Sequence, residues 1–254
     1  MFVDTHCHLT DEQFNEREID QVLANSELEF CVCLGCDTSD SNKALDLAKK
    51  HSKIYCAVGI HPENLDEIED IDAELEEIAR LAKHEKCVAI GEIGLDYHFR
   101  QDNKDQQKEA FVKQIELARK LKKPVCIHCR DAEDDMLEIL SQNKENLGAG
   151  FVMHCYSAGE QYVNKFANLG AYFGLAGNFT YKSYNTACAL KMPPNKIMLE
   201  TDSPYLAPGK FRGQKNNPTL VSLVADKLAE VLGLTYEEIT SRTTKNAKNF
   251  YGIK

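Results

Sequence analysis

Short runs of apolar and β-branched residues alternate along this chain with stretches whose apolar residues repeat every three to four positions. The runs predict strands and the stretches between them predict helices, as in the series from Ile68 to Ala82. The predicted strands cover residues 2–5, 30–34, 54–60, 88–93, 125–128, 151–154, 171–175 and 196–201. Eight strand-helix alternations within 254 residues predict an α/β fold, a single-domain (β/α)₈ barrel that spans residues 1–254.

An open, doubly wound sheet is the alternative architecture for such an alternation. It is disfavoured because no glycine-rich G-x-G-x-x-G turn follows the first predicted strand. After the eighth strand the helical period continues, and residues 235–250 are predicted to form a final helix.

The composition is that of an ordinary globular protein, with 43% apolar and 28% charged residues. We find neither an apolar run of about 18 residues nor a signal-peptide pattern, so we expect a cytoplasmic protein without a membrane segment. The net charge of -10 argues against a broad basic surface for non-specific nucleic-acid binding. It leaves a nucleic-acid substrate open, because local charge and bound divalent ions govern the potential in a cleft.

The ten cysteines lie mostly inside apolar runs, where a free thiol behaves as a small buried hydrophobe. We therefore expect reduced thiols. Cys126 and Cys129 have the CxxC spacing of a zinc or redox site, and Cys31, Cys33 and Cys36 form a second group of closely spaced cysteines. Neither group has a second cysteine pair elsewhere in the sequence that would complete such a site.

Histidines and carboxylates fall at the carboxyl ends of the predicted strands. The first are His6 and His8, which can close on one metal ion because alternate residues of an extended segment point to the same side. The others are His61, Glu92, His128, His154, Glu200 and Asp202. In a barrel these strand ends converge on one mouth, where active sites are found, so the sequence predicts a metal site there.

Each of these residues also has an ordinary structural interpretation. His51 and His84 lie near helix ends among charged residues, and we interpret them as surface histidines. Asp202 could cap the turn before Pro204. Glu92 is harder to explain in this way, because a carboxylate at the end of an apolar strand is costly to bury unless it is paired or metal-bound.

The chain resembles the TatD family of metal-dependent hydrolases, a branch of the amidohydrolase superfamily. The resemblance covers the full length and rests on several motifs in the same order: Asp4-Thr5-His6-Cys7-His8, Gly59-Ile60-His61-Pro62, Ile90-Gly91-Glu92-Ile93-Gly94-Leu95-Asp96-Tyr97, Pro124-Val125-Cys126-Ile127-His128-Cys129-Arg130-Asp131-Ala132, His154-Cys155-Tyr156-Ser157 and Leu199-Glu200-Thr201-Asp202-Ser203-Pro204-Tyr205-Leu206. It implies a TIM barrel with a divalent metal centre and phosphodiester hydrolysis, typically of DNA, by an exonuclease-type deoxyribonuclease.

The resemblance also implies a set of ligands for two divalent ions. His6, His8, Glu92 and Asp202 would hold the first ion, and Glu92, His128 and His154 the second, with Glu92 as the bridge. The many imidazoles favour zinc or manganese, while the carboxylates leave magnesium possible.

Our mechanistic hypothesis is attack on the phosphodiester by a metal-bound hydroxide, with Asp202 and Glu92 as catalytic residues and Asp202 as the general base. Arg130 would contact phosphate, unless it is engaged by Asp131 or another carboxylate. We assign His61 and Glu200 to support of the ligands or contact with substrate, and His98 to proton donation. Lys210, Arg212 and Lys215 form a basic loop in which Arg212 is a candidate contact to DNA at the barrel mouth.

Two positions depart from the family pattern, Asn217, where relatives usually carry a glutamate, and His98. Both lie in loops expected to meet substrate, so they bear on substrate choice.

Hydrolysis of another ester or amide, such as an aminoacyl-tRNA ester, is the alternative activity, since fold alone does not set substrate. A non-catalytic nucleic-acid binding protein and a thiol redox protein are further alternatives. We expect a monomer, because no long exposed apolar stripe is evident.

Overall fold

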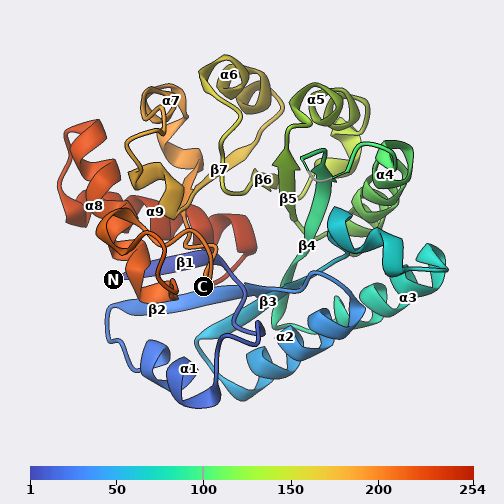
Figure 1. Ribbon diagram of the computed structural model, residues 1–254, viewed down its shortest axis with the longest axis horizontal. Coiled ribbons are helices and arrows are strands. Elements are labelled where there is room, and N and C mark those ends of the chain that lie inside the picture. The colour runs from blue at the N-terminus through green and yellow to red at the C-terminus, as the bar shows by residue number, and fades with distance from the viewer. Residues whose placement is uncertain (99) are drawn as a thin grey trace.

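The computed structural model describes residues 1–98 and 100–254, and its centre is an eight-stranded sheet in the order β1 to β8 with every neighbouring pair parallel (Figure 1). The strands are β1 (Phe2–Cys7), β2 (Leu28–Leu34), β3 (Ile54–Val58), β4 (Cys87–Asp96), β5 (Val125–Arg130), β6 (Phe151–Met153), β7 (Tyr172–Leu175) and β8 (Ile197–Leu199). All of them fall on predicted runs, so the predicted single-domain (β/α)₈ barrel is confirmed.

Helices alternate with the strands and surround the sheet (Figure 1). They are α1 (Glu16–Leu23), α2 (Thr38–Lys50), α3 (Ile71–Leu81), α4 (Lys104–Leu121), α5 (Glu133–Gln142), α6 (Glu160–Asn168), α7 (Ala187–Lys191), α8 (Val221–Leu232) and α9 (Tyr236–Tyr251). The predicted final helix corresponds to α9, which begins at a capping box between Thr235 and Glu238. In the described part of the chain, no helix combines the length and apolar character needed to cross a bilayer.

The first and last strands meet just beyond the end of β8. The backbone N–H of Asp202 donates to the carbonyl of His6 at 2.9 Å, and the N–H of His8 donates to the carbonyl of Ser203 at 2.7 Å. Cys7 and Ser203 form an isolated parallel bridge between them. These bonds nearly close the barrel and bring the carboxyl ends of its first and last strands together at the mouth.

Four strands, β3, β6, β7 and β8, are shorter in the structure than predicted, by one or two residues at an end. β3 ends at Val58 because Pro62 begins a 3-10 helix over Pro62–Glu67, and His61 caps that helix. β6 ends at Met153, so His154 lies one residue beyond the strand. Both histidines nevertheless point into the mouth, because loops that follow strand ends also project there.

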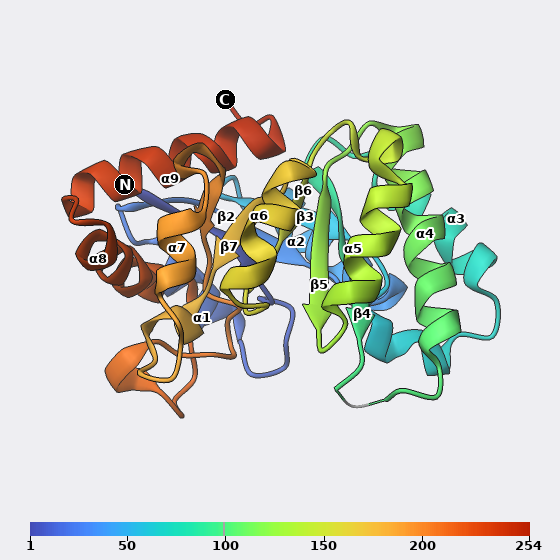
Figure 2. The same ribbon diagram turned by 90° about the horizontal axis from the view of Figure 1, so that it is seen from above.

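The core has two parts, one inside the barrel and one between the sheet and the helices. Figure 2 shows α9 lying across the end of the barrel opposite the mouth. Its residues Phe250 and Tyr251 pack with the interior residues Val3 and Phe30, and the Tyr251 hydroxyl donates to the carbonyl of Thr5 at 3.0 Å. The helix therefore seals the amino-terminal end and leaves the carboxyl end open.

A row of cysteines crosses the first four strands at one level. Cys7 is in register with Cys33, Cys33 with Cys56, and Cys56 with Cys87. All four are buried, and all belong to the core between sheet and helices. All ten cysteines are free thiols, as the sequence predicts for buried apolar positions.

Candidate metal centre

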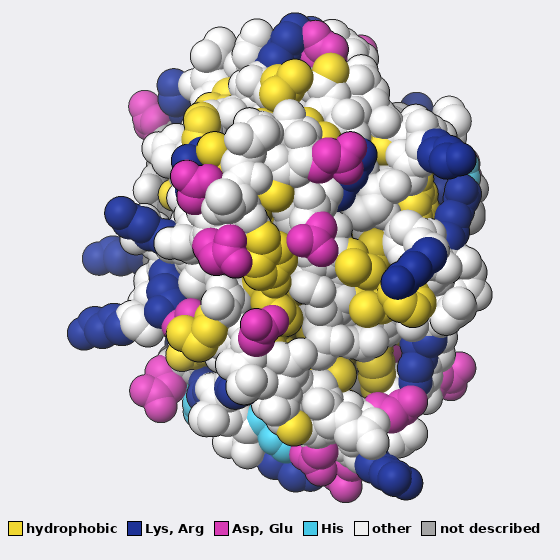
Figure 3. Space-filling model, turned by 90° about the vertical axis from the view of Figure 1, so that its left-hand side faces the viewer, with side chains coloured by type: hydrophobic (Ala, Val, Ile, Leu, Met, Phe, Trp, Pro, Cys, Tyr) yellow, Lys and Arg dark blue, Asp and Glu magenta, His cyan; other side chains and the backbone are white. Residues whose placement is uncertain are grey.

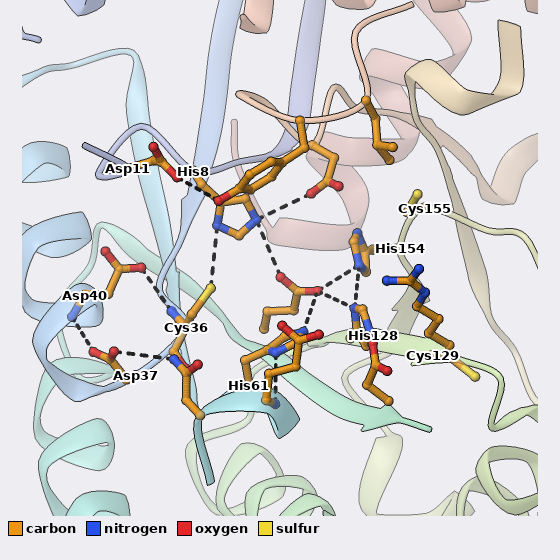
Figure 4. Close-up of a pocket in the computed structure, with 18 of the residues that line it drawn as sticks. His8, Asp11, Cys36, Asp37, Asp40, His61, His128, Cys129, His154 and Cys155 are labelled. Carbon is orange, nitrogen blue, oxygen red and sulfur yellow. Dashed lines mark hydrogen bonds and ion pairs between the residues drawn. The ribbon is translucent and has the colours of Figure 1, made fainter. Parts of the chain in front are cut away.

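A cavity of about 820 Å³ opens at the carboxyl ends of the strands. Its walls come from loops that follow different strands, and Figure 4 shows His8, His61, His128 and His154 converging on its centre. The predicted strand-end residues His8, His61, Glu92, His128, His154 and Asp202 all line it. The structure thus brings together residues that the sequence places far apart.

Four side chains from three strands form the first cluster. The Nε2 atoms of His6 and His8 lie 3.1 Å apart, and Oε2 of Glu92 lies 3.2 Å from His6 and 3.6 Å from His8. Oδ1 of Asp202 lies 3.6 Å and 3.4 Å from the same two nitrogens. One oxygen of Glu92 and one of Asp202 therefore each lie within 3.6 Å of the same two imidazole nitrogens.

These separations fit a small divalent cation. Zinc binds nitrogen and oxygen at about 2.0–2.2 Å, so two ligand atoms of a tetrahedral site lie roughly 3.3–3.6 Å apart. The measured distances of 3.1–3.6 Å fall close to this range. His6, His8 and Glu92 are also less than a tenth exposed, as expected for ligands withdrawn from bulk water.

A second cluster surrounds the other oxygen of Glu92. Its Oε1 lies 2.9 Å from Nδ1 of His128, 2.8 Å from Nε2 of His154 and 3.6 Å from Nε2 of His61. The two nitrogens of His128 and His154 are 3.3 Å apart. The two oxygens of Glu92 therefore face two different sets of histidines.

Three overlapping groups in the described residues are compact enough to hold a metal ion: His6 with His154 and Asp202; His6 with His8 and Glu92; and His61 with Glu92 and His128. The last group places His61 among the candidate ligands, whereas the sequence assigned it to support or to substrate contact. His61 lies at the N-terminal cap of the 3-10 helix after β3. The spacing of residues in the sequence does not tell whether a side chain at this position binds a metal ion itself or supports a residue that does.

The carboxylates of the centre are ionised. Burial alone would raise the pKa of Glu92, but attraction to His154 and the hydrogen bond from His128 hold the pKa well below the ordinary value. Burial also opposes ionisation of Asp202, and there the hydrogen bond from His8 and the nearby histidines lower the pKa. Both side chains are thus available as anionic ligands at neutral pH.

The histidines divide into two kinds. Burial lowers the pKa of His61 to about 3, so its imidazole is neutral, the form that binds metals. His154 is equally buried, but attraction to Glu92 and Glu200 outweighs burial and raises its pKa well above the ordinary value. In the metal-free protein the centre therefore carries protons that an incoming cation must displace.

Asp4 holds the ends of β1 and β8 in position beneath the first cluster. Its Oδ1 accepts from the backbone N–H of Thr201 at 2.9 Å, and its Oδ2 accepts from the Thr201 hydroxyl at 2.5 Å. Oδ1 also accepts from the N–H of His6 at 3.2 Å. Because Asp202 follows Thr201 directly, one buried carboxylate fixes the backbone of candidate ligands from the first and the last strand.

Helix α4 fixes two other strand ends through buried glutamines. The side chain of Gln107 bonds both the N–H and the carbonyl of Asp96, at 2.8 and 2.9 Å. Gln114 bonds both groups of Ile60 in the same way, at 2.8 and 3.1 Å. Ile60 precedes His61, so α4 sets the position of a candidate ligand.

Asp96 and Gly94 in turn position His128. Oδ2 of Asp96 lies 2.8 Å from Nε2 of His128 and orients the imidazole with Nδ1 toward Glu92. Gly94 is in register with His128 and has a φ of +150°, and a side chain on it would overlap the His128 carbonyl. Glycine therefore permits the close strand contact that places His128 beside Glu92.

The family model described as TatD related DNase matches residues 3–252 of the chain. This chain belongs to the TatD family. It is 36% identical to the uncharacterized metal-dependent hydrolase YabD of Bacillus subtilis, over all of both chains. It is 34% identical to the uncharacterized metal-dependent hydrolase YcfH of Escherichia coli, over 99% of this chain and 96% of that protein.

A solved structure gives the same result. The crystal structure of YJJV, a TatD homologue from Escherichia coli, superposes with a TM-score of 0.92 over 100% of this chain and 98% of that chain, at 28% identity. The family recognised from the motifs is thus confirmed: the chain is a metal-dependent hydrolase of the TatD family, and it contains residue groups able to hold metal ions.

The substrate-contact residues predicted from the sequence lie in different places. His61 and Arg130 line the cavity. Glu200 does not: it is 1% exposed and lies behind His154, where its Oε1 is 3.4 Å from Nδ1 of that histidine and accepts from the N–H of Cys155 at 2.5 Å. The structure therefore gives Glu200 a supporting position.

The predicted loop contacts lie outside the cavity wall. Arg212 is exposed, with its guanidinium carbon 4.5 Å from the centre of the Tyr181 ring. Nδ1 of His98 lies 2.8 Å from Oδ2 of Asp131, while Phe99 lies outside the described residues. Asn217 caps the short 3-10 helix Pro218–Leu220 by accepting from the N–H of Thr219.

The cysteine alternatives find no support in the geometry. Cys126 and Cys129 occupy β5, where residues three apart point to opposite faces, and Cys126 lies inside the barrel with its sulfur 3.4 Å from the Tyr251 hydroxyl. In the described residues, none of the groups compact enough for a metal ion contains a cysteine.

Proposed function

We propose that this TatD protein is a divalent-metal-dependent phosphodiesterase that degrades DNA as an exonuclease at the mouth of the barrel. The observation that carries the proposal is the position of Glu92 between two histidine clusters, one facing each carboxylate oxygen. A carboxylate in this position suits two ions about 3.5–4 Å apart, an arrangement used in phosphodiester hydrolysis. The matching family, TatD related DNase, supports the same activity.

In this proposal His6, His8, Glu92 and Asp202 hold one ion, and Glu92, His128 and His154 hold the other. His61 is the candidate additional ligand. Imidazole-rich sets favour zinc or manganese, with magnesium possible at the carboxylates. When bound, such ions activate water for attack and stabilise charge on the phosphate oxygens.

Asp202 and Arg130 act on the substrate side. The Asp202 side chain is 15% exposed toward the cavity, and its lowered pKa keeps it a carboxylate that can orient water and accept its proton. Arg130 lines the cavity, so its guanidinium can bind a phosphate through two parallel hydrogen bonds. We propose further that the enzyme acts as a cytoplasmic monomer.

The test is hydrolysis of a short end-labelled DNA strand, beside an aminoacyl ester, with and without EDTA. We expect cleavage from one DNA end that EDTA abolishes, and loss of cleavage in E92A and D202A. The matched control is E85A, because Glu85 is an exposed carboxylate before β4, at the opposite end of the barrel. Full activity of E92A and D202A, or turnover of the aminoacyl ester alone, would overturn the proposal.

A further inference from the structure

One aromatic ring stands exposed at the rim of the cavity. Tyr205 is 50% exposed, and it lines the cavity three residues after the candidate ligand Asp202. In the described residues, the other exposed large apolar side chains are Met1 and Leu190, and neither lines the cavity. Among these three exposed side chains, Tyr205 is thus the one that a ligand in the cavity can contact.

The ring is held rigidly. The backbone N–H of Tyr205 donates to the carbonyl of Asp202 at 2.9 Å, and its carbonyl accepts from the Asn216 amide at 2.7 Å. Its hydroxyl donates to Oδ2 of Asp11 at 2.7 Å. A side chain fixed at both ends loses little freedom when a ligand binds, which favours contact with a ligand.

The ring lies beside the first metal cluster. Its centre is 6.1 Å from the centre of the His8 ring, with a tilt of 58° between the planes. Figure 4 shows His8 and Asp11 on one side of the cavity and His154 and Cys155 on the other. A planar group attached next to the reacting bond can therefore reach the Tyr205 face while the bond itself lies at the metal cluster.

Charge on this side of the cavity favours a neutral group. Asp11, Asp37 and Asp40 line it, and the last two are engaged at the start of α2, where Oδ1 of Asp37 accepts from the N–H of Asp40 at 2.7 Å. Carboxylates repel the phosphates of a nucleic acid. An uncharged aromatic face among them suits a nucleobase, while Arg130 on another part of the wall suits phosphate.

We propose that the Tyr205 ring is a stacking subsite for the nucleobase next to the scissile phosphodiester. This inference rests on the proposed function and adds what the enzyme recognises in its substrate. Stacking on an aromatic ring is tolerant of sequence, because every base has a π-face. The subsite therefore selects for the presence of a base rather than for its identity.

The test compares two oligonucleotides that differ only at the end that is cleaved, where one carries a base and the other an abasic residue. In Y205A we expect KM for the substrate with a base to rise roughly 5- to 150-fold, the affinity that one base–aromatic stack contributes. KM and kcat for the abasic substrate should stay within about twofold of wild type. Y205F keeps the ring and should restore most of the preference.

L190A is the matched control, because Leu190 is 64% exposed and lies outside the cavity wall. It should change neither KM. An equal rise in KM for both substrates in Y205A would overturn the stacking subsite and leave the nuclease intact. Failure of the wild-type protein to cleave either oligonucleotide would overturn the proposed function and the subsite with it.

Discussion

Single buried residues that contact no substrate set much of the geometry of the centre. Asp4 and Glu200 are each 1% exposed or less, and they support Asp202 and His154 respectively. Each acts by accepting hydrogen bonds from backbone or imidazole groups. The ligands thus depend on a second layer of carboxylates for their orientation, as is usual around metal-binding histidines.

Replacing Asp4 by alanine should destabilise the fold and loosen the first cluster. The N–H and hydroxyl of Thr201 and the N–H of His6 would lose their shared acceptor, and unsatisfied buried groups cost about 1–3 kcal/mol. Urea unfolding should show a loss of that size. Asp20→Ala, at an exposed position of α1, should stay within about 0.5 kcal/mol of wild type, and an equal loss in both would contradict the role of Asp4.

Metal affinity should weaken as pH falls. Burial opposes protonation of His154 and His128, but Glu92 and Glu200 raise the pKa of His154, and Asp96 and Glu92 raise the pKa of His128. Below these raised pKa values the imidazoles are protonated and cannot bind a cation; above them the competition disappears. Titration calorimetry with zinc at pH 7, in buffers of different ionisation enthalpy, should reveal proton release. Equal heats in all buffers would show that no proton is displaced.

At the scale of elements, α4 holds two strand ends in place through side-chain hydrogen bonds to their backbone. Gln107 and Gln114 stand two helical turns apart on one buried face, and each bonds both backbone groups of one residue at the barrel mouth. The helix thereby holds Asp96 and Ile60, which position His128 and His61. Because of this role, α4 carries two polar side chains, Gln107 and Gln114, in the face that it buries.

Gln107→Leu preserves most of the side-chain volume but removes both bonds to Asp96. We expect a loss of about 1–3 kcal/mol in stability, because a buried N–H and a buried carbonyl lose their partner. Metal affinity should fall as well, since Asp96 orients His128. Gln106→Leu, at the neighbouring exposed position, is the control for both unfolding and metal titration.

The sequence predicted the strands and their polar ends well, because the carboxyl ends of parallel strands must meet at one mouth. It did not separate His61 from supporting residues or place Glu200 behind His154, since side-chain direction after a strand depends on loop conformation. The glutamines of α4 gave no signal, because in an amphipathic helix they look like surface residues. The exposure of the Tyr205 ring depends on tertiary packing, which the periodicity of apolar residues does not predict.

At the scale of the whole molecule, acidic residues outnumber basic ones by 40 to 30. On the face shown in Figure 3, lysines and arginines are interspersed with aspartates and glutamates. With a net charge of -10, attraction of DNA to the surface at large is weak. Recognition in our proposal is therefore local, at the metal clusters, Arg130 and Tyr205.

Removal of metal should lower the thermal stability of the entire barrel. The first cluster joins β1, β4 and the end of β8, so an ion bound there links the first and last strands. At a free zinc concentration of 100 Kd, binding stabilises by about 2.7 kcal/mol, or roughly 5–10 °C in Tm. Calorimetric scans with zinc and with EDTA should differ by this amount. E92Q should show little difference between the two.

The meeting of β1 with the segment after β8 sets an order of events during synthesis. His6 and His8 leave the ribosome well before Asp202, because most of the barrel lies between them in the sequence. The growing chain therefore carries a pair of imidazoles without the carboxylates that complete the cluster. Selective, tight uptake of the ion must wait until the last strand has emerged and docked, so loading with metal belongs to the end of folding.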